Sequence, residues 1–210
     1  MSIILNKVKT EVFSNISLEL KKGEKIAILG KNGIGKTTFL RTLMGLVPFE
    51  GDIKIFDTNL KDKKDFKTIY SDVGYLFQDS NDSFIAPSVH EEVAFSLYNK
   101  TSNFNESMAK AENILKEFKI EHIKDKVPLK LSGGQKKIVS IAAVLAHEPK
   151  LLLLDEPAND LDTSVSSMLQ DRLNRFDGSM IIIVHNINFA KNIVDKFYEL
   201  TSSGLNEVFI

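Results

Sequence analysis

The chain has 210 residues, of which 43% are hydrophobic and 26% are charged, and its formal net charge is −1. This length suits one large domain with its own core, and the near-neutral charge lacks the basic excess of nucleic-acid-binding proteins, so no nucleic-acid partner is expected. The absence of cysteine excludes disulfides and thiolate metal sites. No apolar run approaches the roughly 18 residues of a membrane-spanning helix, and the N-terminus lacks a signal-peptide pattern. We therefore expect a cytoplasmic protein that meets a membrane only through a partner.

Short apolar runs alternate with helical patterns along the chain, which is typical of a mostly parallel sheet covered by helices. The apolar runs predict strands at Lys25–Leu29, Asp52–Phe56, Val73–Phe77, Leu151–Leu154, Met180–Val184 and Phe197–Leu200. The helical patterns cover residues 36–45, 88–98, 106–118, 134–146, 164–175 and 187–195. Two of the strands are apolar at nearly every position, as expected where both faces of a sheet are buried. The sequence therefore predicts an α/β fold.

Residues 79–131 differ from the segments on either side of them. They contain two helical patterns joined by polar connections, and no convincing strand. We interpret them as a helical subdomain inserted into a core that residues 1–78 and 132–210 form. The chain 1–210 is then a single domain with one inserted lobe.

The stretch Gly30–Thr38 reads GKNGIGKTT and joins a predicted strand to a predicted helix. Gly30, four further residues, and then Gly35, Lys36 and Thr37 form the complete phosphate-loop pattern. The glycines let backbone N–H groups curl around phosphates, the helix N-terminus favours an anion, and the lysine and threonine suit the β- and γ-phosphates and Mg²⁺. The predicted nucleotide-binding residues are Gly30, Lys31, Asn32, Gly33, Ile34, Gly35, Lys36, Thr37 and Thr38.

Two acids follow the buried strand in the stretch LLLLDEP, which spans Leu151–Pro157. Asp155 lies where α/β sheets place ligands, so we expect it to hold Mg²⁺ or a water bound to it. Glu156 is expected to orient or deprotonate an attacking water. By themselves these acids would fit a helix N-cap, but the phosphate loop requires an acidic partner of this kind. The next strand ends at His185, which we expect at the same sheet edge and within reach of a γ-phosphate, although such a histidine is often a capped core residue.

The sequence LSGGQ at Leu131–Gln135 precedes a predicted helix, which makes it a second anion-binding helix start. Together, and in this order, the motifs resemble those of the nucleotide-binding subunit of ATP-binding-cassette (ABC) proteins over essentially the whole chain. The resemblance implies an ATP-hydrolysing P-loop NTPase with a RecA-like core, antiparallel N-terminal strands and an inserted helical lobe. It implies ATP and Mg²⁺ as cofactors.

The resemblance also implies how the motifs are used. A head-to-tail dimer, homomeric or heteromeric, covers each ATP with residues of the other subunit, which here are Ser132, Gly133, Gly134, Gln135 and Asp162. Gln78 matches the family's glutamine loop, which senses Mg²⁺ and the γ-phosphate. The implied metal ligands are Thr37, Gln78 and Asp155. The implied catalytic residues are Glu156, His185, Lys36 and Gln78.

Two positions depart from the family pattern. Many members carry an arginine three residues after LSGGQ, where this chain has Ile138. The family also stacks an aromatic ring on adenine from a loop before the first motif, but the matching stretch Lys7–Thr10 contains no aromatic residue. We expect Val8 to make only apolar contact with the base, and we interpret Phe13 as part of the core.

The segment after the glutamine favours one branch of the family. Its sequence FIAPSVHEEVAFS, at Phe84–Ser96, is similar to that of energy-coupling-factor (ECF) importers, which move cobalt, nickel or vitamins such as biotin. This similarity implies integral membrane coupling and substrate-binding subunits as partners, and a peripheral location on the cytoplasmic face of the cell membrane. The alternatives are the ATPase of a lipid or drug exporter and a soluble regulatory ABC ATPase. The pair Phe84–Ile85 is interpreted as a docking element, with packing inside the lobe as the alternative.

Overall fold

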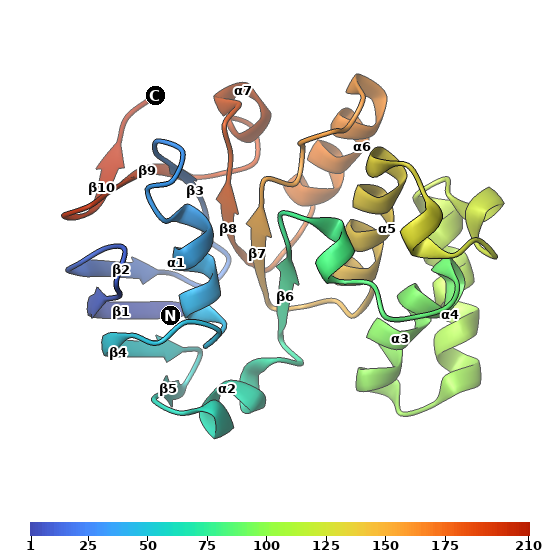
Figure 1. Cartoon of the computed structure of the whole chain (residues 1–210), viewed down its shortest axis with the longest axis horizontal. Coiled ribbons are helices and arrows are strands. Elements are labelled where there is room, and N and C mark those ends of the chain that lie inside the picture. Colours follow the sequence, from blue (N-terminus) through green and yellow to red (C-terminus); the bar gives the residue numbers. More distant parts are fainter.

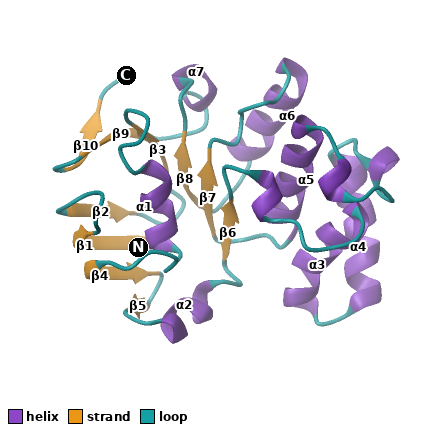
Figure 2. Ribbon diagram, in the orientation of Figure 1, coloured by secondary structure: helices purple, strands orange, loops and turns teal.

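A computed structural model describes residues 1–210, except for the side chains of residues 99 and 101. Two sheets and their covering helices make up the molecule (Figures 1 and 2). The strands are β1 (Ile3–Lys9), β2 (Ile16–Leu20), β3 (Lys25–Leu29), β4 (Glu50–Ile55), β5 (Thr58–Leu60), β6 (Val73–Leu76), β7 (Leu151–Asp155), β8 (Ser179–Ile183), β9 (Lys196–Thr201) and β10 (Gly204–Val208). The helices are α1 (Lys36–Leu43), α2 (Lys63–Ile69), α3 (Val89–Thr101), α4 (Phe104–Glu117), α5 (Gly133–Ala146), α6 (Thr163–Asn174) and α7 (Ile187–Ala190). Short 3₁₀ turns are η1 (Ser80–Asp82), η2 (Glu121–Ile123) and η3 (Pro128–Lys130).

The larger sheet has six strands in the order β10-β9-β3-β8-β7-β6. All its neighbouring pairs are parallel except β10 with β9. In its centre, Ile183 of β8 pairs with Ile28 of β3 on one side and with Asp155 of β7 on the other. The ends of these three strands are therefore level, and the loops that follow them leave from one edge of the sheet.

The smaller sheet has the order β2-β1-β4-β5, and all its pairs are antiparallel. It confirms the antiparallel N-terminal strands that the family resemblance implied. The predicted strand at 52–56 overlaps β4, which ends at Ile55, and so belongs to this sheet and not to the parallel one. Strands β1 and β2 lack a continuous apolar run. In β2, buried residues alternate with exposed ones, so the apolar pattern did not predict this strand.

Two hydrophobic cores lie on opposite faces of the larger sheet. One face packs against α1 and the smaller sheet, and the other packs against α3, α4, α5 and α6. Successive residues of β7 alternate between the cores, with Leu151 and Leu153 in the first and Leu152 and Leu154 in the second. This arrangement explains the uninterrupted apolar sequence of the strand, because both of its faces are buried.

The segment between β6 and α5 contains α3, α4 and the three short turns. Helices α3 and α4 lie beside each other and against α5, at one end of the molecule (Figure 1). Val89 and Val93 of α3, together with Ala111 and Leu115 of α4, are buried in the core that α5 shares. This segment therefore packs its apolar side chains against the helix that follows LSGGQ.

The last predicted helix is shorter than expected. The pattern predicted residues 187–195, but α7 ends at Ala190. Downstream, the main-chain N–H of Asp195 donates to the carbonyl of Lys25 at 2.7 Å, and the Asp195 carboxylate accepts from the N–H of Lys25 at 2.8 Å. These bonds turn the chain into β9 beside β3, and they replace the helical hydrogen bonds that the pattern predicted. Among the described residues, no helix combines the length and apolar character needed to cross a membrane.

Truncation of the last leucine of α1 tests the packing between the sheets. Leu43 is 1% exposed in the first core, whereas Leu46, three residues later, is 54% exposed. We expect Leu43→Ala to lower the free energy of unfolding by about 2–5 kcal/mol, because it removes buried methyl groups and leaves a cavity. Leu46→Ala should change it by less than about 0.5 kcal/mol. Urea denaturation followed by circular dichroism measures both, and equal losses would contradict the packing described.

Candidate functional site

The loop between β3 and α1 holds a backbone that few residues other than glycine adopt. Gly30, Gly33 and Gly35 have φ angles of 148°, 78° and 105°. A Cβ atom on Gly35 would lie 2.6 Å from Cγ1 of Val12, so both the backbone conformation and the close approach require glycine there. The glycines of the predicted phosphate loop therefore have a structural reason within this chain.

The N-terminus of α1 has features that suit the binding of an anion. No side chain caps the helix N-terminus, and no acidic residue lies in its first turn. The first N–H groups of a helix lack intrahelical partners, so they are available to a phosphate. Lys36 is 6% exposed, and its Nζ donates to the carbonyls of Gly30 at 2.9 Å and Lys31 at 3.1 Å. The ammonium group is thus held inside the curve of the loop.

A pocket of about 720 Å³ lies over this loop. It is lined by Val12, Asn32, Gly33, Gly35, Lys36, Thr37, Thr38, Gln78, Glu156, Asn159 and His185. The structure therefore brings most of the predicted phosphate-loop residues together with the predicted glutamine, glutamate and histidine. Gly30 and Lys31 contribute carbonyls to Lys36, while Ile34 packs toward the first core.

Glu156 is held in place by two neighbours across the pocket. Nε2 of His185 lies 2.6 Å from Oε1 of Glu156, and the Asn159 side-chain amide donates to Oε2. Glu156 has a φ of 50°, a left-handed conformation that is unfavourable for a residue with a side chain and that often marks a functional site. The carboxylate therefore has a defined position at the end of β7.

Asp155 is fully buried, and neither of its carboxylate oxygens has a well-formed hydrogen bond from any described residue. Burial raises the pKa of Asp155 above its ordinary value, the nearby Thr37 hydroxyl opposes this rise, and the charge of Glu156 adds to it. Buried carboxylates without partners are rare because their desolvation is costly. Two oxygens left without partners beside the phosphate loop match the ligand preference of Mg²⁺.

LSGGQ begins α5 but does not reach the phosphate-loop pocket. Ser132 caps the helix, its hydroxyl accepts from the N–H of Gln135 at 3.4 Å, and the Gln135 side chain accepts from the N–H of Ser132 at 3.3 Å. A Cβ atom on Gly133 would meet nothing within 4 Å. No close contact within the chain therefore explains why this position is glycine. None of the residues that line the phosphate-loop pocket belongs to LSGGQ, and Asp162 is absent from them as well.

Comparison with known proteins gives the family. The model of the ABC transporter family matches residues 13–159, which include the phosphate loop, LSGGQ and both acids. The chain belongs to the ABC transporter family. It is an ABC ATPase, and its P-loop α/β fold agrees with that of solved ABC cassettes.

Three relatives illustrate the similarity. A Brucella suis protein assigned as an ABC transporter ATP-binding protein is 37% identical over 92% of this chain and 81% of its own length. CbiO1 of Clostridium perfringens, part of the ABC transporter complex CbiONQ, has a TM-score of 0.81 and 29% identity over 97% of this chain and 86% of its own. The cassette MJ0796, solved as a dimer with ADP and Pi, has a TM-score of 0.86 and 26% identity over 98% and 97% of the two chains.

The pocket of this ABC ATPase includes two residues that the sequence analysis missed. Val12, 45% exposed, lines it, whereas Val8, expected near the base, is 1% exposed in the core, so that expectation was wrong. Phe13 packs edge-to-face on Phe39 with the ring centroids 6.2 Å apart, which confirms its core role. Asn159 lies three residues after Glu156 and its amide suits a carboxylate, but only the turn after β7 directs the two side chains together.

Asp162 has a structural task within its own chain. It is the N-cap of α6, where its Oδ1 accepts from the N–H of Val165 at 2.9 Å. The side chain is exposed. The capping bond occupies one carboxylate oxygen of Asp162.

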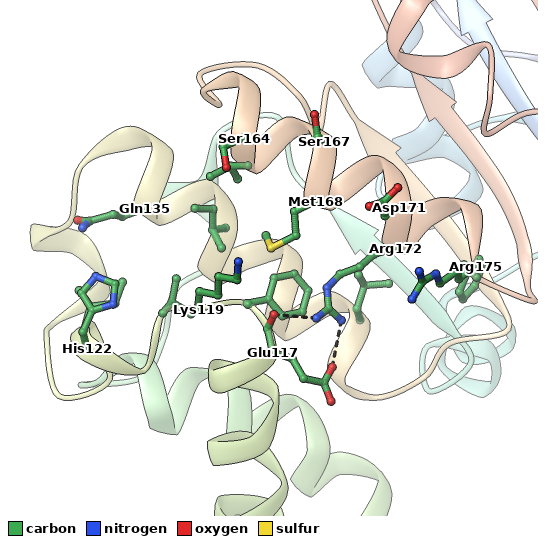
Figure 3. Close-up of a pocket in the computed structure, with 17 residues that line it drawn as sticks. Glu117, Lys119, His122, Gln135, Ser164, Ser167, Met168, Asp171, Arg172 and Arg175 are labelled. Carbon is green, nitrogen blue, oxygen red and sulfur yellow. Dashed lines mark hydrogen bonds and ion pairs between the residues drawn. The ribbon is translucent and has the colours of Figure 1, made fainter.

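A larger groove, about 960 Å³, lies between the end of α4, α5 and α6 (Figure 3). It is lined partly by apolar residues, including Met168 and Ile138, the latter at the position where many family members have arginine. Its central cation, Arg172, donates to the carboxylate of Glu117 at 3.1 Å and to the Glu117 carbonyl at 2.9 Å. No phosphate-loop residue lines the groove. The larger groove is therefore separate from the pocket over the phosphate loop.

Neutralising the buried Asp155 tests how much free energy of folding the burial of its carboxylate costs. In the absence of metal, Asp155→Asn should raise the free energy of unfolding at pH 7 by about 1–3 kcal/mol, because it removes a charge whose burial outweighs the help of its neighbours. A raised pKa in the folded state means that this cost is relieved as pH falls through it, so the difference should shrink toward pH 4. Urea denaturation across this pH range measures it. Asp162→Asn, at an exposed cap, is the control, and a loss of stability in Asp155→Asn would contradict the burial argument.

Proposed function

We propose that this ABC ATPase powers an importer of the energy-coupling-factor type, which carries a transition-metal ion such as cobalt or nickel, or a vitamin such as biotin. Two similarities support this branch. The ATP-binding protein EcfA2 of an energy-coupling-factor transporter from Methanospirillum hungatei is 37% identical over 87% of this chain and 47% of its own length. CbiO1 belongs to a complex with other named subunits. The proposed substrate classes follow from the resemblance of the segment at Phe84–Ser96.

The observation that carries the enzymatic part is the contact of Glu156 with His185 above the phosphate loop. In the proposed arrangement, the N–H groups at the start of α1 and the ammonium of Lys36 hold the β- and γ-phosphates of ATP. Thr38 and the N–H groups of residues 31–35 complete the cradle. Val12 offers the base apolar contact at the pocket wall, without aromatic stacking.

Asp155, Thr37 and Gln78 are the proposed ligands of Mg²⁺, bound directly or through water. The unpartnered oxygens of Asp155 and the position of Thr37 at the pocket fit an oxygen-ligated cation. Mg²⁺, when bound with ATP, neutralises charge that develops on the β- and γ-phosphate oxygens. The chain's contribution is to hold the carboxylate of Asp155 in a buried position, where it interacts strongly with a cation.

Glu156 is the proposed general base. Its carboxylate takes a proton from, or orients, the water that attacks the γ-phosphate, and His185 and Asn159 fix its two oxygens in position. His185, whose side chain is 42% exposed, also faces the space where the γ-phosphate would lie. Phosphoryl transfer depends mainly on such positioning and on charge stabilisation.

Exchange of Glu156 for glutamine separates binding from hydrolysis. Glu156→Gln should lower kcat about 10²- to 10⁴-fold, because the base is lost, while the dissociation constant for ATP stays within about 3-fold. A coupled phosphate-release assay and titration with a fluorescent nucleotide measure the two quantities. Glu11→Gln, at an exposed acid outside the pocket, is the matched control. Hydrolysis at the wild-type rate by Glu156→Gln would refute the assignment.

A head-to-tail dimer accounts for the position of LSGGQ. Its helix start lies outside the phosphate-loop pocket, and the open space beside Gly133 allows a nucleotide on another subunit to approach closely. Ser132, Gly134 and Gln135 would then contact the γ-phosphate from across the interface, with Asp162 beside them. MJ0796 was solved as a dimer.

Analytical ultracentrifugation tests the dimer. Glu156→Gln with ATP should sediment as a dimer, and a purely monomeric sample would count against the proposal.

The proposed membrane partners dock on the segment after Gln78. Residues 79–131 are taken as the helical subdomain, and residues 1–78 and 132–210 as the RecA-like core. Ile85 is 70% exposed, whereas Phe84 is half-buried and packs against the helical core. Phe95 of α3 is also exposed at 46%. The docking element is therefore centred on Ile85, and the ATPase is proposed to lie on the cytoplasmic face of the cell membrane.

Substitution of Ile85 tests this docking surface. Ile85→Ser should weaken association with an integral membrane subunit roughly 5-fold or more, because a truncated apolar anchor costs over about 1 kcal/mol. ATPase activity of the isolated protein should stay the same. Purification from native membranes, with mass spectrometry of the companions, provides the readout.

Leu129→Ser is the matched control, because this leucine is 55% exposed but lies on η3. Equal recovery of membrane subunits with both variants would refute docking at Ile85. The identity of the recovered subunits distinguishes an energy-coupling-factor importer from an exporter, and the absence of any membrane subunit from the wild-type sample would favour a soluble regulator.

A further inference from the structure

Lys137 is a charged side chain in an almost fully buried position. It lies on α5, two residues after LSGGQ, and is 4% exposed. Its Nζ lies 3.0 Å from the carbonyl oxygen of Gln78 and 3.4 Å from that of Phe77. Both carbonyls belong to the main chain directly after β6. A single ammonium group thus connects the helix that follows LSGGQ with the backbone of the glutamine loop.

The surroundings of Lys137 are acidic as well as dry. Burial lowers the pKa of Lys137 from its ordinary value, and nearby carboxylates oppose the shift. These carboxylates are Asp155, Asp160, Glu156 and Asp79. They belong to the end of β7, the turn after it and the glutamine loop. The ammonium group is therefore surrounded by the segments that carry the proposed metal ligand, the general base and Gln78.

Folding stability alone does not explain a lysine at this position. Burial of an ammonium group costs several kcal/mol unless hydrogen bonds and opposite charges offset it, and an apolar residue of similar volume often packs at least as well. An exposed lysine is the usual case. The neighbouring Lys136 is such a case, because it is only half-buried and its Nζ reaches the Asn81 side chain at 2.9 Å. Lys137 differs from it, because its partners are the main-chain carbonyls of Phe77 and Gln78 and its charged neighbours lie around the ATP pocket.

We propose that Lys137 is a positioning residue that fixes the main chain of Gln78 to the helix beginning at LSGGQ. Because Lys137 bonds to the main-chain carbonyl of Gln78, and Gln78 lines the ATP pocket, we expect the start of α5 and Gln78 to move as one unit. A shift of α5, as when a second subunit engages LSGGQ, then repositions the proposed metal ligand in the ATP pocket. This inference rests on the proposed function of the site and adds a coupling element to it.

Lys137→Met removes the ammonium group while keeping a chain of similar length. We expect kcat for ATP hydrolysis to fall about 10- to 100-fold, because misplacement of a ligand by a fraction of an ångström is costly. The KM for ATP should change less than about 3-fold, since the phosphate loop is intact, and half-maximal activity should need several-fold more Mg²⁺. Lys137→Arg, which keeps the charge and the donors, should recover part of kcat. The melting temperature of Lys137→Met should fall, because two carbonyls lose their donor, so kcat is measured well below the melting temperature of the variant.

Lys136→Met is the control for a lysine on the same helix that reaches the same loop, and it should keep kcat within about 2-fold of wild type. A first experiment must show that the wild type hydrolyses ATP and that Glu156→Gln does not. If the wild type shows no such hydrolysis, the proposed function is refuted and not this inference. Given that activity, wild-type kcat in Lys137→Met would overturn the inference. So would equal losses in the two methionine variants, or a loss of kcat fully explained by a lower melting temperature.

Discussion

The site of this ABC ATPase depends on the parallel register at the centre of the larger sheet. Ile28, Ile183 and Asp155 lie level on β3, β8 and β7. Because the strands are parallel and end together, the phosphate loop, the acids after β7 and His185 leave the sheet at one edge. Segments separated by more than a hundred residues thereby meet in one pocket. The two hydrophobic cores matter to function mainly because they hold this register from both faces.

Several buried charges lie at this edge of the sheet. Asp155 is a buried carboxylate whose pKa is raised by burial, Glu156 has a left-handed backbone, and Lys36 and Lys137 are buried cations that donate to main-chain carbonyls. A buried charge and a left-handed residue other than glycine each cost free energy of folding. In our proposal, ATP and a divalent cation bind here, and their charges complement Lys36 and Asp155.

LSGGQ and the surface around Ile85 lie on the exterior of the protein. Gly133 has open space beside it, and Ile85 is a large apolar residue left in solvent. In our proposal, Gly133 meets a second ATPase subunit and Ile85 meets a membrane subunit. Between them runs the segment from Gln78 to α3, joined to α5 by Lys137. In our proposal this route links ATP hydrolysis with movement of the membrane partner.

Contiguous motifs could be interpreted from the sequence alone, because their chemistry is local. The phosphate loop needs its glycines and lysine at set spacings, the buried strands need unbroken apolar runs, and LSGGQ needs its helix start, so the family and the α/β fold followed from the residues. The positions of Val12, Asn159 and Lys137 did not, because each acts on residues distant in the chain or across a turn. Strands β1 and β2, in which polar and buried residues alternate, were not predicted for a similar reason, because their buried face depends on packing between the two sheets. Tertiary structure decided which side chains share the pocket, because only the packing of the sheets sets which loop ends meet.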